Sequence, residues 1–355
     1  MARIHIGAAG GAPSNNFIRS LRKSQRKDYL IGTASTPSDL FLADTDEKYV
    51  VPEALSSEYP KALLLILRKA KPDFLHTQND SEVLAVSRLR DEIAGEKVKT
   101  YLPARETIEI AMDKFASYEK WSKAGLRVPK TVLLRNESDL QNAFKQFGPK
   151  LWVRAKRGAA GKGALPTESF DFAKLWIEHF KGWGEFTAAE RLTEDTVTWQ
   201  SIWHEGELVV AQTRKRRSWS FGNRTLSGVT GITAVGETCS DTKVDEVAQA
   251  AIFALDSKPH GIFGVDMTYD KDGVANPTEI NIGRFFTTHY FFTEAGLNMP
   301  EIFCNIALDR KFPSLAKKIN PLPNGLIWIR GMDTLPALTT AVELEKLEQC
   351  ASKTI

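Results

Sequence analysis

Cysteine and long apolar stretches are both scarce in this sequence. Its 355 residues include three cysteines, Cys239, Cys304 and Cys350, which lie far apart and form no CxxC pair. This pattern indicates buried thiols in a reducing compartment rather than a zinc site. No apolar run approaches the roughly 18 residues needed to span a bilayer, and the N-terminus lacks the residue order of a signal peptide. We therefore expect a cytoplasmic protein without a membrane partner.

A strong excess of one charge is also missing. The sequence has 47 Lys and Arg against 44 Asp and Glu, which leaves a formal net charge of +3. That charge is too small for a surface that binds nucleic acid along its length, so we expect no nucleic-acid partner. Hydrophobic residues make up 42% and charged residues 26% of the chain, as in soluble globular proteins. The length favours two or three lobes over one compact core.

Several well-known catalytic motifs are absent as well. The sequence has neither a G-x-S-x-G nucleophile elbow nor a Walker A motif, and its cysteines show no matching arrangement of histidines. The glycines of GAAGGAP, residues 7–13, do not meet the G-x-G-x-x-G spacing. We interpret them as a tight strand-to-helix turn, with an anion at the helix N-terminus as the lesser alternative. An NAD(P)-dependent oxidoreductase is the function that this segment alone would suggest.

Strand and helix patterns alternate in the first hundred residues. Apolar segments typical of buried strands are followed by segments with helical spacing. The expected strands are 3–7, 28–34, 73–78 and 97–103, and the expected helices are 15–27 and 62–72. This alternation predicts a parallel sheet with helices on both faces, an α/β domain over residues 1–103.

The pattern changes after residue 103. A long helical stretch begins at Ala104, breaks at AGLRVP (124–129) and leads into a strand, and a glycine-rich loop follows a second strand. HEGE (204–207) and DKDG (270–273) are typical hairpin turns. These features predict a mixed, partly antiparallel α+β region. The segment from Pro321, with a helix at 340–350, is expected to pack back on the body.

Oxygen-bearing side chains cluster on the predicted 261–282 hairpin. Asp266 and Glu279 lie on its two strands, and Asn281 shares the face of Glu279 because strand side chains alternate. Carboxylate and amide oxygens suit Mg²⁺, with Mn²⁺ as an alternative, and such a cation keeps sites open for substrate phosphates. The alternative is a strand that merely exposes polar residues on one face.

A basic strand precedes the glycine-rich loop. Arg154 and Lys156 come directly before it, and Lys162 lies within it, between Gly161 and Gly163. Glycines allow backbone N–H groups to approach phosphates, and the basic side chains supply positive charge. The alternative is an ordinary solvated loop.

The order of these elements resembles the ATP-grasp superfamily of ligases, in its carbamoyl-phosphate-synthase-like branch. The resemblance rests on DKF (113–115), AGLRVPKT (124–131), the glycine-rich loop, AERL (189–192) and GVDMTYDKDGVANPTEIN (264–281). It implies a Rossmann-like domain at 1–103, an ATP-grasp subdomain with the loop at 104–188, a second subdomain with the metal site at 189–310, and a C-terminal segment at 311–355.

The resemblance also implies ATP and Mg²⁺ as cofactors and assigns roles to individual residues. Lys114, Arg154 and Lys156 match phosphate contacts, and Asp195 stands where a ribose contact is common. The mobile loop would include Gly158, Ala159, Ala160 and Gly161, and the adenine edge would be bound by Glu190, Arg191 and Leu192. Asp266, Glu279 and Asn281 match the metal positions.

The implied reaction is activation of a small carboxylate as an acyl phosphate, which an amine then attacks. ADP, phosphate and an amide are the products, and Arg284 would be the catalytic residue that stabilises the oxyanion. Many family members read E-x-N-P-R, whereas this chain reads EINIGR, so Arg284 is shifted by one position. A nucleotide-binding regulatory module without turnover is the alternative, and a homodimer is conceivable.

Three further segments are candidates for the walls of the cleft. RKRRSWSFGNR (214–224) is interpreted as a solvated loop or as a flap that meets an anion when it closes on a hinge at 227–231. HTQND (76–80) would face the same cleft. His289 is interpreted as a core residue rather than a catalyst, with Thr287 and Thr288 lining the acceptor site.

Overall fold

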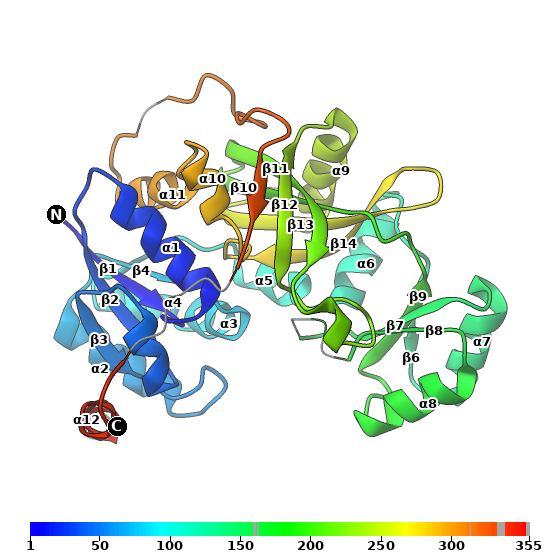
Figure 1. The fold of residues 1–355 in the computed structure, drawn as a ribbon, viewed down its shortest axis with the longest axis horizontal. Coiled ribbons are helices and arrows are strands. Elements are labelled where there is room, and N and C mark those ends of the chain that lie inside the picture. Colours follow the sequence, from blue (N-terminus) through cyan, green and yellow to red (C-terminus); the bar gives the residue numbers. More distant parts are fainter. Residues whose placement is uncertain (159–160, 162, 313, 332–337, 353–355) are drawn as a thin grey trace.

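Three β-sheets lie side by side in the structure (Figure 1). The structure is a computed structural model, and it describes residues 1–158, 161, 163–312, 314–331 and 338–352. We call the sheets N-terminal, central and small. The N-terminal sheet is parallel and the paired strands of the other two sheets are antiparallel, which is the predicted combination of α/β and α+β parts.

The N-terminal sheet has five parallel strands in the order β3-β2-β1-β4-β5. They are β1 (Arg3–Gly7), β2 (Tyr29–Ala34), β3 (Glu47–Val50), β4 (Phe74–Thr77) and β5 (Lys99–Thr100). The connections contain α1 (Ala12–Lys23), η1 (Pro37–Leu42), α2 (Tyr59–Ala70), α3 (Asp80–Arg88) and α4 (Arg90–Gly95). All the strands expected from the sequence are present, and β3 is an additional one.

The glycines after β1 form the expected strand-to-helix turn. Gly10 has a φ of 94°, in the left-handed region that favours glycine. A β-carbon on Gly10 would lie 2.1 Å from the backbone oxygen of Asp39, because the turn packs against η1. Backbone conformation and close packing therefore account for this glycine.

The central sheet has six strands in the order β14-β13-β10-β11-β12-β15. They are β10 (Thr196–His204), β11 (Glu207–Trp219), β12 (Thr233–Cys239), β13 (Gly261–Tyr269), β14 (Ala275–Ile282) and β15 (Ile327–Ile329). The HEGE and DKDG segments form the predicted turns of the β10–β11 and β13–β14 hairpins. Residues 214–219 belong to β11, so the interpretation of 214–224 as a loop is wrong for its first half.

The two faces of the central sheet differ in polarity. Val197, Trp199, Val265 and Ile280 belong to a core that also contains residues of α2, α3 and α4 and of three helices from later in the chain. These helices are α5 (Arg105–Ala111), α6 (Lys114–Lys123) and α9 (Thr242–Phe253). Because side chains alternate along a strand, the intervening residues project from the opposite face, where the polar side chains gather.

The small sheet has the order β6-β9-β7-β8 and carries the glycine-rich loop between β7 and β8. Its strands are β6 (Thr131–Leu134), β7 (Leu151–Ala155), β8 (Leu165–Thr167) and β9 (Phe186–Glu190), packed against α7 (Glu137–Phe147) and α8 (Phe170–His179). Ala159, Ala160 and Lys162, predicted for this loop, lie outside the described residues.

Four helical elements remain among the described residues, and they lie in different parts of the structure. They are α10 (Tyr290–Glu294), α11 (Met299–Ala307), the short η2 (Gly222–Arg224) and α12 (Ala341–Ser352). The C-terminal helix α12 lies near β3 and η1, far along the chain from both (Figure 1). No helix among the described residues is long and apolar enough to cross a membrane. The four predicted domain ranges stay a prediction, and α5 and α6, from 104–188, pack on the central sheet.

Candidate functional site

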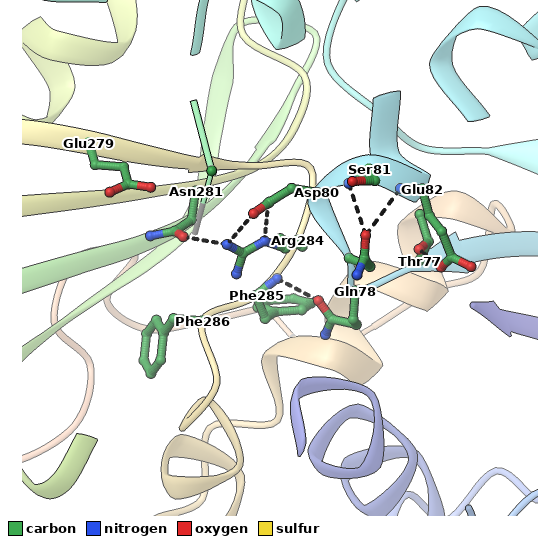
Figure 2. A network of polar contacts seen from close by, with 12 residues as sticks. Thr77, Gln78, Asp80, Ser81, Glu82, Glu279, Asn281, Arg284, Phe285 and Phe286 are labelled. Carbon is green, nitrogen blue, oxygen red and sulfur yellow. Dashed lines mark hydrogen bonds and ion pairs between the residues drawn. The ribbon is translucent and has the colours of Figure 1, made fainter. Parts of the chain in front are cut away.

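Asp266 and Glu279 stand opposite each other on the polar face of the central sheet. They are direct partners in the antiparallel register of β13 and β14. The Nδ2 atom of Asn281 donates a hydrogen bond of 3.0 Å to Oδ2 of Asp266. The hairpin thus brings the three predicted metal residues together, and Figure 2 shows Glu279 and Asn281 on the same strand.

This donor set fits a hard divalent cation with an incomplete protein shell. The described residues contain no group of three or more His, Cys, Asp or Glu side chains that could hold a metal by themselves, so the protein shell here is incomplete. Two carboxylates and one amide remain, and the side chains of Asp266 and Glu279 are each 28% exposed. Mg²⁺ prefers oxygen donors and takes water and substrate phosphates for its other positions. The residues therefore suit a metal that is shared with a phosphate ligand.

Two cations lie beside Glu279 at the edge toward the small sheet. Nζ of Lys114 is 3.4 Å from Oε1 of Glu279 and donates a 2.7 Å hydrogen bond to the backbone oxygen of Gly158. Arg154 on β7 donates to the backbone oxygen of Thr278, at 2.9 Å. Burial lowers the pKa of Arg154, and the charge of Glu279 acts against that shift. Lys114, Arg154 and the glycine-rich loop thus meet the carboxylates from one side.

Lys114 owes its position to the start of α6. The long helical stretch predicted from residue 104 is interrupted before Lys114, and Asp113 caps the new helix by accepting hydrogen bonds from the backbone N–H groups of Phe115 and Ala116. This is the usual role of Asp at a helix N-cap. Lys114 is the first residue of α6, and its side chain is 9% exposed.

Lys156 and Gly161 have different surroundings from those of Lys114. Nζ of Lys156 donates to the backbone oxygen of Gly184 and pairs with Glu185, both at 3.0 Å, so this ammonium group is engaged within the small-sheet region. A β-carbon on Gly161 would lie 2.6 Å from the backbone oxygen of Val229. The glycine-rich loop therefore touches the 227–231 segment, which was predicted to be a hinge.

The residues predicted to bind adenosine lie on the connection between the small and central sheets. Oε2 of Glu190 accepts a 3.0 Å hydrogen bond from the backbone N–H of Lys130. Arg191 is exposed, and Leu192 is half-buried. The backbone oxygen of Asp195 accepts a 3.0 Å hydrogen bond from the backbone N–H of Tyr269, and the Asp195 side chain is exposed. Their nucleotide contacts stay a prediction.

On the other side of Asp266, two arginines project from β11. The hydroxyl of Thr198 on β10 donates to Oδ1 of Asp266 and accepts a 2.7 Å hydrogen bond from Arg214. Arg216 approaches the same carboxylate oxygen at 3.8 Å. Arg214 is 2% exposed, so it is a buried cation and not part of a solvated loop.

A strap formed by residues 284–288 follows β14 and passes between the N-terminal and central sheets. Each of its five residues makes at least one hydrogen bond with a side chain from another part of the chain. The pairs are Arg284 with Asp80, Phe285 with Gln78, Phe286 with Gln200, Thr287 with Asn16, and Thr288 with Arg214. HTQND (76–80) therefore faces this region, as expected, and Figure 2 shows the contacts of Arg284 and Phe285.

Arg284 joins the metal strand to the N-terminal part of the chain. One of its terminal nitrogens donates to Oδ2 of Asp80 at 3.0 Å and to Oδ1 of Asn281 at 2.7 Å. Burial would raise the pKa of Asp80, but the Arg284 charge outweighs this effect and the pKa is lowered. Arg284 is thus held next to the predicted metal residues by a carboxylate that is 204 residues away in the sequence.

His289 lies in the core, as interpreted from the sequence. Its side chain is fully buried, and Nδ1 is 2.8 Å from the backbone oxygen of Phe286. Burial lowers its pKa to about 4, which makes it a neutral residue at physiological pH.

Thr198 was not among the predicted site residues, and Asp80, Arg214 and Arg216 were named only as parts of candidate segments for the cleft walls. Arg214 and Arg216 could have been placed by alternation, because residues two apart on a strand share a face. The basic composition of 214–217 hid that pattern. Asp80 and Thr198 carry no local signal, since their partners are distant in sequence.

Comparisons with known proteins give a fold. No family model matches the chain, and no curated protein matches it. Among solved structures, it is similar to biotin carboxylase from Campylobacter jejuni in complex with β-γ-ATP (TM-score 0.69, 17% identity, covering 88% of this chain and 72% of that one). Carboxyaminoimidazole ribonucleotide synthase from Aspergillus clavatus, complexed with ATP, gives a TM-score of 0.67 at 18% identity, covering 90% and 79%. L-amino acid ligase from Bacillus licheniformis gives 0.66 at 12%, covering 87% and 74%.

This chain has the ATP-grasp fold. That is the fold predicted from the order of its motifs. In this ATP-grasp fold, the glycine-rich loop of the small sheet and the polar face of the central sheet meet at Lys114 and Glu279.

Proposed function

We propose that this protein is an ATP- and Mg²⁺-dependent ligase that activates a small carboxylate as an acyl phosphate and joins it to an amine. One observation carries the proposal. Asp266, Glu279 and Asn281 share one polar face, with Lys114 and Arg154 on one side and Arg284 on the other. Structures of this fold include complexes with ATP and with ADP, which supports a nucleotide as the first ligand.

The nucleotide end of the site would be formed by the small sheet. Lys114 and Arg154 would contact the phosphates, and the loop from Gly158 to Gly161 would cover them with backbone N–H groups. Glu190, Arg191, Leu192 and Asp195 would hold the adenosine. Asp266, Glu279 and Asn281 would hold Mg²⁺, which supplies positive charge to the phosphate oxygens when it is bound.

The reaction requires positioning and charge neutralisation rather than a protein nucleophile. An oxygen of the substrate carboxylate would attack the γ-phosphorus, and the bond to ADP would break. The amine nitrogen would then attack the acyl carbon and release one proton to solvent, and phosphate would leave as the amide forms. Arg284, fixed by Asp80 and Asn281, would stabilise the tetrahedral oxyanion and the departing phosphate in the second step.

The described cysteines fit this mechanism because they are poor nucleophiles. Burial raises the pKa of Cys239 to about 11, and it raises the pKa of Cys304 well above its ordinary value. Both thiols stay protonated at physiological pH, and the thiolate is the nucleophilic form. The side chain of Cys350 lies outside the described residues.

The test is release of ADP from Mg·ATP by the full chain, screened over pairs of carboxylates and amines. We expect release that requires both substrates and a divalent metal, Mg²⁺ or Mn²⁺. Glu279→Gln should lower the rate by about a hundredfold or more, because it removes a charge from the metal site. The matched control is Asp272→Asn, in the exposed turn of the same hairpin, which should keep its rate.

Two outcomes would contradict the proposal. A folded Glu279→Gln variant with wild-type turnover would remove the metal assignment. Nucleotide binding without ADP release for any substrate pair would instead favour a regulatory nucleotide-binding module.

A further inference from the structure

The polar face of the central sheet contains a buried arginine without a carboxylate partner. Arg214 donates from its terminal nitrogens to the hydroxyls of Thr233 at 2.8 Å, Thr288 at 3.0 Å and Thr198 at 2.7 Å. Its Nε has no hydrogen-bond partner among the described residues. All its partners are therefore neutral, although a buried charge is costly unless an opposite charge compensates it.

Arg216 lies two residues further along β11 on the same face. It donates to Thr196 at 2.8 Å and to Thr233 at 3.1 Å, and its guanidinium stacks at 3.7 Å on the ring of Trp219. Its nearest carboxylate oxygen, in Asp266, is 3.8 Å away, and its side chain is 10% exposed. Hydrogen bonds and stacking thus fix Arg216 next to Arg214, but its side chain stays partly exposed.

The charge of Arg216 acts on the buried Arg214 in addition to the effect of burial. Burial, and after it the charge of Arg216, lowers the pKa of Arg214 to about 9. Asp266 is the carboxylate that acts against this shift. Because Asp266 is also one of the proposed metal residues, a bound dication would share its negative charge, and a further anion beside the two arginines would then be favoured.

The sheet has a built space for Arg214. Gly236 on β12 pairs with Arg216 in the register, and a β-carbon at this position would lie 3.0 Å from Cδ of Arg214. Only a glycine leaves the Arg214 side chain unhindered here. The arrangement therefore depends on a residue of a third strand and not on the basic segment alone.

The arginine pair is separate from the cations on the nucleotide side. Glu279, Asp266, Thr198 and Arg214 form a row across four neighbouring strands. Three strand spacings of about 4.8 Å place the backbone of Arg214 about 14 Å from that of Glu279. Lys114 and Arg154 lie at the Glu279 end of this row. Arg214 instead contacts Thr288 of the strap, whose neighbour Thr287 is bonded to Asn16 of the N-terminal part.

We propose that Arg214 and Arg216, with the hydroxyls of Thr233 and Thr288, bind a second anionic group of the acid substrate, a carboxylate or a phosphate. This inference rests on the proposed function and names its substrate class: an acid with one reacting carboxylate and one further oxyanion. Arg216 makes the direct contact, because it is the accessible member of the pair. Arg214 supplies charge and fixes the hydroxyls. The planar donor arrangement of arginine suits both kinds of oxyanion.

The experiment measures anion binding by calorimetry to the full chain saturated with Mg²⁺ and a non-hydrolysable ATP analogue, which occupies the γ-phosphate position. The probes are glutarate, inorganic phosphate and the monocarboxylate butyrate. We expect wild-type protein to bind glutarate or phosphate about tenfold more tightly than butyrate, and the preferred probe distinguishes a carboxylate from a phosphate.

Arg216→Gln should weaken binding of the preferred anion by about tenfold or more and leave the affinity for the ATP analogue within about threefold. The matched control is Arg217→Gln. Arg217 points to the other face, where it pairs with Glu237 at 2.7 Å, so this variant should bind like the wild type. Gly236→Ala keeps both arginines but crowds Arg214, and it should also weaken the anion with circular dichroism unchanged.

Three results would overturn the inference: equal binding of glutarate, phosphate and butyrate by the wild type, unchanged anion binding by Arg216→Gln, or an Arg216→Gln defect confined to the ATP analogue. These are binding measurements, so they do not depend on turnover. If the ADP-release screen instead finds monocarboxylates turned over as fast as acids with two anionic groups, the inference fails while the proposed function stands.

Discussion

Replacing Asp80 by Asn tests how the strap is attached to the N-terminal part of the chain. Asp80 accepts two hydrogen bonds from the largely buried Arg284, whose side chain is 12% exposed. Removing one partner of a buried ion pair costs about 3–5 kcal/mol, mainly because the other charge is left uncompensated. The Asp80 side chain is 29% exposed, and Arg284 keeps its bond to Asn281, so solvent and a neutral acceptor offset part of that cost. We expect Asp80→Asn to lower the free energy of unfolding by about 2 kcal/mol.

The pH dependence of this difference follows from the lowered pKa of Asp80. A carboxyl with a folded pKa below its ordinary value of 3.8 stabilises the fold above that value. The contribution is lost as the pH falls through the folded pKa, because the carboxyl becomes protonated. The difference between wild type and Asp80→Asn should therefore be largest near neutral pH and should shrink below about pH 4.

The assay is urea unfolding followed by circular dichroism, at about pH 7 and about pH 3.5. The exposed Asp91, in α4, provides the control substitution Asp91→Asn, which should change stability little. A destabilisation by Asp80→Asn of less than about 0.5 kcal/mol near neutral pH would refute the reasoning. So would a difference that grows as the pH falls.

Three further predictions concern buried polar groups and the candidate site. Burial lowers the pKa of His5 and His289 to about 4 and of His76 to about 3, below the ordinary 6.5. The free energy of unfolding should therefore be unaffected by these histidines above about pH 6.5 and should fall toward pH 4, because only the unfolded chain takes up their protons. Urea midpoints should show this fall, and His289→Phe should reduce it. Asp245→Ala should cost about 3 kcal/mol, because it leaves the buried donors of Trp199 and Asn320 unpaired, and a loss under about 1 kcal/mol would contradict this. Lys114→Met should weaken binding of a Mg·ATP analogue about 10- to 100-fold by calorimetry, whereas Lys130→Met, at an exposed lysine, should not.

The local parts of the site could be predicted because they depend on short-range rules. Glu279 and Asn281 share a face because side chains alternate along a strand, and a register shift between Asp266 and Met267 brings Glu279 opposite Asp266. The glycines after β1 also follow a local rule, because the turn needs a left-handed backbone. The interpretation of residues 214–219 as a loop was wrong for a local reason as well. Their charges suggested a solvated loop, although a strand can bury every second side chain.

The sequence by itself determined the order of strands and turns, the face that bears the oxygen ligands, and the glycine-rich loop after a basic strand. Only the tertiary structure decided that Lys114 reaches Glu279, that Lys156 is engaged with Glu185, and that Asp80 holds Arg284. The physical reason is range. Alternation and turn geometry act over a few residues. These charge pairs join residues that are far apart in the sequence, so they form only when the folded chain brings their elements together and buries the charges.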